Sequence, residues 1–76
     1  MAYRMTLIEA PEGTERLGHT VTYSPILVEG KMIERYELVL EADFLPCGCA
    51  YAADPSEFKD LVHQWGTTGK VLLPEI

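Results

Sequence analysis

The amino-acid sequence predicts an α+β fold, in which a three- to four-stranded antiparallel β-sheet carries one amphipathic helix packed on one face. The predicted order along the chain is β-β-β-α-β. Two patterns support this fold class: residues 36–42 alternate apolar and polar side chains as a half-buried strand does, and residues 55–65 place apolar side chains at helical spacing. The 76 residues suffice for one small domain, which we assign to residues 1–76.

The first strand is predicted over Tyr3–Ile8, because apolar and polar residues alternate along it. Pro11 and Gly13 then end the strand, and residues 11–18 have the composition of an exposed loop. We expect the buried face of this strand to carry its apolar set, Tyr3, Met5 and Leu7.

A hairpin is predicted from two longer strands, about His19–Val28 and about Met32–Ala42, joined by a tight turn at Glu29-Gly30. Pro25 cannot donate a hydrogen bond to a neighbouring strand, so the first of these strands is expected to be an edge or to be bulged there. The second has the clearest alternation in the chain. Its expected apolar face consists of Tyr36, Leu38, Leu40 and Ala42.

The helix is predicted over Pro55–Trp65 from its first residues and from its apolar stripe. Asp54 is a favourable N-cap, proline suits the first helical position, and Glu57 completes a capping box. Gly66 is expected to end the helix, after which Val71–Leu73 forms a short strand that returns to the sheet. The stripe that faces the sheet consists of Phe58, Leu61, Val62 and Trp65.

The charge balance excludes some classes of partner. Twelve Asp and Glu residues against six Lys and Arg give a net charge of -6, so phosphate is repelled and we expect no direct nucleic-acid binding. No apolar run has the length of a membrane helix, and residues 1–10 do not resemble a signal peptide. We therefore expect a cytoplasmic protein without membrane contact.

The most unusual local motif is Cys47-Gly48-Cys49, in a segment, residues 43–53, that we expect to be irregular. Two thiolates in a loop could contribute to a zinc site, could form a strained and easily reduced disulfide, or could simply pack as small side chains. A zinc site needs about two further ligands. The candidates are His19, His63, Asp43 and Asp54. His63 falls on the polar flank of the predicted helix and Asp54 is used as its cap, so we assign His19 to the alternative zinc site.

For function, we expect a non-enzymatic protein-binding module. No catalytic residues are assigned, and we expect no cleft in the usual range of about 300–1,000 Å³. Such a module could be an accessory, adaptor or inhibitor protein, encoded for example by a phage or mobile element, whose acidic surface engages a basic partner surface. The candidate partner-binding residues are Glu37, Glu41, Asp43 and Tyr51.

Two alternatives to this interpretation remain open. One is a metal-binding protein, with zinc held by Cys47, Cys49 and His19, or a thiol-redox protein that uses the cysteine pair. The other is a small enzyme, for which no catalytic residues are assigned. Whatever the function, an open sheet has free edges and a short chain has a small core, so a homodimer is a further expectation.

Overall fold

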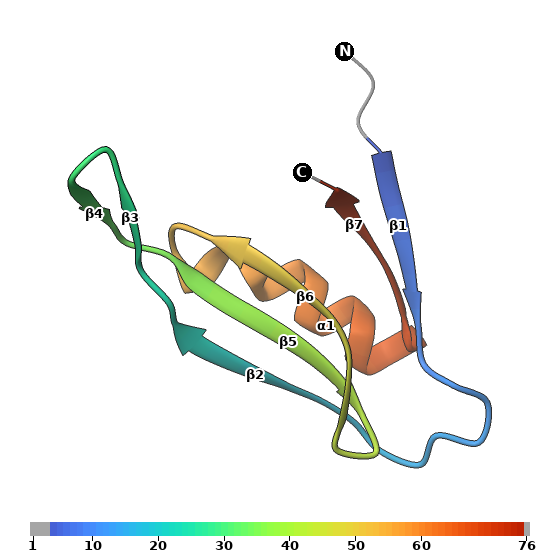
Figure 1. Cartoon of the computed structure of the whole chain (residues 1–76). Coiled ribbons are helices and arrows are strands. Elements are labelled where there is room, and N and C mark those ends of the chain that lie inside the picture. The colour runs from blue at the N-terminus through green and yellow to red at the C-terminus, as the bar shows by residue number, and fades with distance from the viewer. Residues whose placement is uncertain (1–3, 76) are drawn as a thin grey trace.

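A computed structural model of the chain describes residues 4–75 (Figure 1). Tyr3, which the sequence analysis placed in the first strand, lies outside this range. The elements of the described range are β1 (Arg4–Glu9), β2 (Leu17–Tyr23), β3 (Ile26–Val28), β4 (Lys31–Ile33), β5 (Tyr36–Ala42), β6 (Leu45–Ala52), the 3₁₀ turn η1 (Pro55–Phe58), α1 (Lys59–Thr68) and β7 (Lys70–Glu75).

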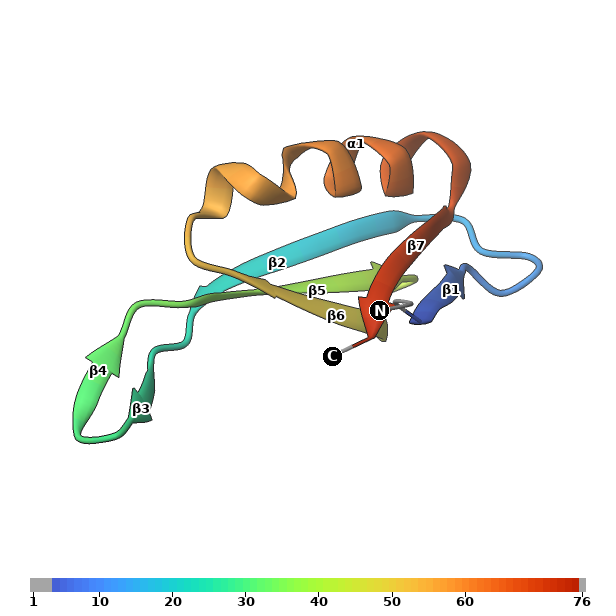
Figure 2. The same ribbon diagram turned by 90° about the horizontal axis from the view of Figure 1, so that it is seen from above.

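The predicted α+β class is confirmed by a three-stranded antiparallel sheet, in the order β2-β5-β6, with α1 across one face (Figure 2). The apolar face expected for residues 36–42 is also confirmed, because it points toward the helix. Figure 2 shows no described element lying over the opposite face, which we call the open face. The buried core lies between the sheet, the helix and β7, and consists of Leu38, Leu40, Ala42, Phe58, Trp65, Val71 and Leu73. The open face carries Thr20, Thr22, Glu37, Val39, Glu41, Cys49 and Tyr51.

The strand expected near residues 71–73 is present, but it does not return to the sheet. β7 instead pairs antiparallel with β1 as a separate ribbon. The predicted burial of Met5 and Leu7 is wrong, since these side chains are 52% and 54% exposed. The reason is that the other face of the strand, continued by Ile8 and Ala10, packs against the core.

The two long strands predicted for the hairpin are each interrupted. Residues 24–25 separate β2 from β3, as Pro25 led us to expect, and residues 34–35 separate β4 from β5. The predicted turn is confirmed: Glu29 and Gly30 have φ values of 49° and 78°, which is typical of a type I′ hairpin. Residues 26–33 therefore form a two-stranded hairpin of their own, which we call the arm.

The segment predicted to be irregular contains β6, so that prediction is wrong. Asp43 and Phe44, with φ values of 49° and 69°, make a second tight turn, after which β6 runs back along β5. Pro46 is tolerated in β6 because this strand lies at the edge of the sheet, with β5 as its hydrogen-bonded neighbour. Gly48 is required by packing, since a Cβ atom there would lie 2.9 Å from Cδ1 of Ile8. β2 likewise begins earlier than predicted, at Leu17.

The helix begins as predicted and ends later. The Asp54 carboxylate accepts a hydrogen bond from the backbone N–H two residues on, at 2.9 Å, and the Glu57 carboxylate accepts from the Asp54 N–H at 3.0 Å. Gly66 does not end the helix, which continues to Thr68. Gly69, with a φ of 70°, provides the left-handed residue at that end instead. None of the described helices is long and apolar enough to span a membrane.

Candidate functional site

The open face has a cluster of interacting side chains where it meets the arm. The Tyr51 hydroxyl donates a hydrogen bond to Oε2 of Glu37 at 2.7 Å, across the register of β5 and β6. The guanidinium of Arg35 lies 4.1 Å from the centroid of the Tyr51 ring. Because its proton is held by the Glu37 carboxylate, the pKa of Tyr51 is raised to about 12.

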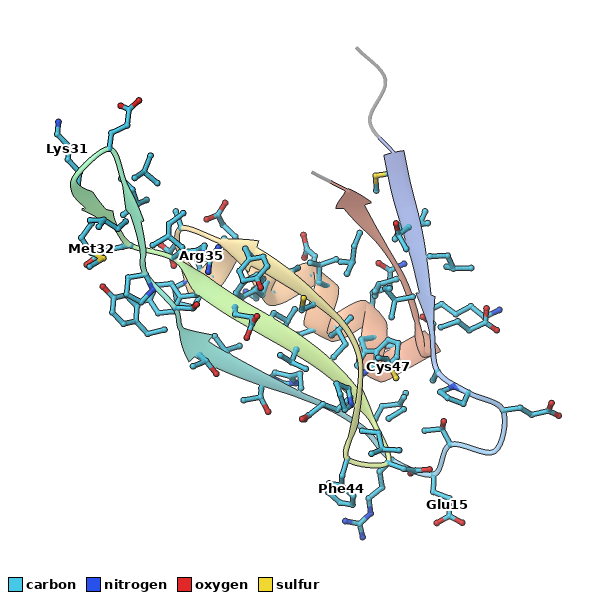
Figure 3. The ribbon with its side chains drawn as sticks, in the orientation of Figure 1. Glu15, Lys31, Met32, Arg35, Phe44 and Cys47 are labelled. Carbon is cyan, nitrogen blue, oxygen red and sulfur yellow. The ribbon has the colours of Figure 1, made fainter. Side chains whose placement is uncertain are left out.

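The same arginine also fixes the base of the arm (Figure 3). Arg35 donates from Nε to the carbonyl oxygen of Ser24 at 2.9 Å and from Nη2 to its hydroxyl at 3.1 Å. On the helix-facing side, the rings of Tyr23 and Tyr36 pack with centroids 5.3 Å apart. The junction between sheet and arm is therefore held from both sides.

The other two predicted partner-binding carboxylates have different surroundings. Glu41 lies on the open face and accepts a hydrogen bond from the Thr20 hydroxyl at 3.2 Å. Asp43 accepts from the backbone N–H groups of Glu15 and Arg16, at 3.0 Å and 2.8 Å, and so fastens the preceding loop to the β5–β6 turn. The structure thus brings Glu37 together with Tyr51, places Glu41 on the same face, and gives Asp43 a structural role.

A hollow of about 350 Å³ lies at the end of the sheet near this turn, which corrects the expectation that no cleft of such a size exists. Phe44, which is 76% exposed, lies beneath the Arg16 guanidinium at 5.8 Å from the ring centroid. This feature could not be predicted from the sequence, because Phe44 was expected in an irregular segment. The hollow is lined by Arg16, Leu17, Gly18, His19, Glu41 and Phe44.

The cysteines do not converge with His19. Cys47 is half-buried and packs against the core, with its thiol 3.8 Å from the Leu45 carbonyl oxygen. Cys49 is exposed and pairs with Val39 on the open face. Within residues 4–75 no group of three or more His, Cys, Asp and Glu side chains is arranged to hold a metal ion.

Exposed apolar side chains form two further surfaces that the sequence analysis missed. One is the arm and the other is the outward face of the β1–β7 ribbon. Both were expected to lie within one sheet, where neighbouring elements would have covered one side of them. Comparisons with protein-family models, with curated proteins and with solved structures found no match to this chain.

Proposed function

We propose that the chain is a small non-enzymatic protein-binding module whose open face engages a basic surface of a partner protein. One observation carries the proposal: α1 covers one face of the three-stranded sheet, and the other face is left free with Glu37 and Glu41 on its central strand. Tyr51 lies beside Glu37 on the neighbouring strand and adds an aromatic contact surface.

The composition of the open face suits such a contact. Val39 and Cys49 form a small apolar centre, with carboxylates before and after it along β5. An apolar centre with a polar rim is the usual anatomy of a protein–protein interface. Because the side chains stand on paired strands, little conformational freedom would be lost on binding.

The charge of the whole chain favours a basic partner as well. A net charge of -6 attracts a lysine- and arginine-rich surface before contact and speeds the encounter. An accessory, adaptor or inhibitor protein, including one encoded by a phage or mobile element, would act in this way by covering the basic surface of its target.

Capture from lysate of the source cell tests the proposal, using the chain at about 50 mM and at about 500 mM salt, where exposed charges are largely screened. Glu37→Gln with Glu41→Gln neutralises the open face while keeping side-chain size. Glu12→Gln with Asp60→Asn removes the same charge from exposed positions elsewhere and serves as the control.

We expect a partner that is retained at low salt, is lost at high salt and is lost with the open-face variant, but is retained by the control. A partner that binds the open-face variant as well as it binds the unaltered chain would refute the proposal. Equal losses with both variants would show attraction by net charge alone, which would also refute a contact through the open face.

A further inference from the structure

The arm exposes apolar side chains on both of its sides. Leu27 and Met32 face each other across the hairpin on one side and are 68% and 64% exposed, while Val28 and Ile33 are exposed on the other. Figures 1 and 2 show the arm projecting beyond the end of the sheet and away from α1, and Figure 3 shows Met32 on this projection. A two-stranded hairpin with uncovered apolar faces is marginally stable in water, so a covering surface would stabilise it.

The arm is nevertheless held in one direction. Its base is closed by the hydrogen bond from the Ser24 N–H to the Arg35 carbonyl oxygen, at 2.7 Å, in addition to the side-chain contacts of Arg35. A projection fixed in this way loses little entropy when it docks.

A second apolar surface lies in the half of the molecule away from the arm, as Figures 1 and 2 show. It is the outward face of the β1–β7 ribbon, where Leu7 and Leu72 stand directly opposite each other and Met5 lies next to them. We call these three side chains the ribbon patch.

We propose that the chain forms a two-fold dimer in which the arm of each copy packs on the ribbon patch of the other. Because arm and patch lie in opposite halves of the molecule, a two-fold pairing of two antiparallel copies places each arm beside the ribbon of the other copy. The inference goes beyond the proposed function and does not depend on it.

The surface area favours two reciprocal contacts over one. A fully exposed aliphatic side chain of this size presents on the order of 100 Å². Leu27 and Met32 on one side of the arm, together with the three side chains of the ribbon patch, therefore offer on the order of 300 Å² per copy. Since interfaces are about 60% apolar, the total is about 500 Å² per copy, or about 1,000 Å² for the dimer, which is at the lower limit for a specific interface. Either contact alone, as with an unrelated partner, would bury only about half of this.

The local charges also favour a second copy. The arm contains Glu29 and Lys31, while β1 and β7 each contain one acidic and one basic residue, so all three segments are neutral. The whole excess of -6 therefore lies elsewhere in the chain. Repulsion between copies acts at long range and is screened by salt, so dimerisation should strengthen as salt rises. Binding of a basic partner to the open face, in contrast, should weaken as the salt concentration rises.

Analytical ultracentrifugation of the full chain tests the dimer at low and high salt. We expect a concentration-dependent mass of twice the 8.5 kDa of one chain, with tighter association at high salt. The arm variant is Leu27→Thr with Met32→Thr, and the patch variant is Leu7→Thr with Leu72→Thr; threonine is polar but retains strand propensity. Leu45→Thr alters an equally exposed side chain outside both surfaces and is the control.

Each double variant alone should be monomeric, and the control should dimerise like the unaltered chain. Circular dichroism of each variant verifies that it is folded.

A monomeric unaltered chain, or a folded arm variant that still dimerises, would overturn the proposal. So would a patch variant that dimerises normally, since that result would indicate contact between two arms or the presence of another occupant on the patch.

Discussion

Replacing Gly48 by alanine should destabilise the fold, although alanine in place of glycine normally stabilises a protein by reducing the conformational entropy of the unfolded chain. The new Cβ would lie 2.9, 3.0 and 3.2 Å from Cδ1, Cγ1 and Cγ2 of Ile8, where ordinary contacts are 3.4–4 Å. Rotation of the outer methyl group alone cannot relieve all three contacts, so either the whole Ile8 side chain must leave its rotamer or β1 must shift. Overpacking of this kind costs about 1–3 kcal/mol, and the lower entropy of the unfolded alanine chain offsets about 0.4–1 kcal/mol. The net loss should be about 1–2 kcal/mol.

Urea unfolding at fixed protein concentration measures this loss, which corresponds to a fall in melting temperature of about 5–15 °C for a domain of this size. Gly66→Ala is the matched control, because it lies inside α1 with nothing within 4 Å of the added Cβ, and it should stabilise the protein by about 0.5–1 kcal/mol. Ile8→Val alone should cost about 0.5–1.5 kcal/mol, but it removes the closest clash and should cost nothing further in the Gly48→Ala background. A neutral Gly48→Ala change, or additive effects of the two changes, would refute the reasoning.

Three further predictions concern single side chains. Trp65→Phe keeps a ring in the core but removes the N–H that donates to two strand carbonyl oxygens, both at 3.1 Å, so urea unfolding should show a loss of about 1–3 kcal/mol. The Asp54 carboxylate accepts a hydrogen bond from the Ser56 backbone N–H, which holds the pKa of Asp54 below its usual value. The stability that this carboxylate contributes is therefore complete above the pKa of Asp54 in the unfolded chain, and it is lost as the pH falls through the pKa in the folded protein. Asp54→Asn, which can cap but does not titrate, should flatten the acid limb of the melting-temperature profile; parallel profiles would contradict this. Glu37→Gln should lower the pKa of Tyr51 from about 12 toward 10, as followed by phenolate absorbance, and an unchanged titration would show that the carboxylate is not the cause.

Local interactions explain which elements could be predicted from the sequence. The start of the helix depends on Asp54, Pro55 and Glu57, which lie within one turn of each other, and the structure has this capping box. The buried face of residues 36–42 was predictable because its two faces differ clearly in polarity. Both signals are contained in a few consecutive residues.

Long-range packing explains the errors. Gly48 indicated a loop, yet its lack of a side chain serves the close approach of Ile8 from the other end of the chain. The alternating pattern of the first strand predicted the wrong buried face, because the pairing of β1 with β7 determines which face of β1 points inward. No local pattern contains either contact.

The candidate site was predictable in its residues more than in its geometry. Glu37 and Glu41 share the open face as their spacing in a strand requires. The contact between Glu37 and Tyr51 depends on the register of β6, a strand that was not predicted. Asp43 could not be assigned correctly because its partners, Glu15 and Arg16, approach from a distant loop.

The pairing of β1 with β7 has a consequence for the order in which the protein assembles and opens. This ribbon closes a loop of nearly the whole described chain, whereas β5–β6 closes across a tight turn, and the entropy lost on closure grows with loop length. We expect β1 to join last and to detach first, while the sheet, the helix and β7, which carries the buried Val71 and Leu73, persist. In hydrogen exchange, the ribbon amides that are hydrogen-bonded across the pair should therefore lose protection before those of Leu38 and Leu40. Simultaneous exchange would show that the molecule opens as a single cooperative unit.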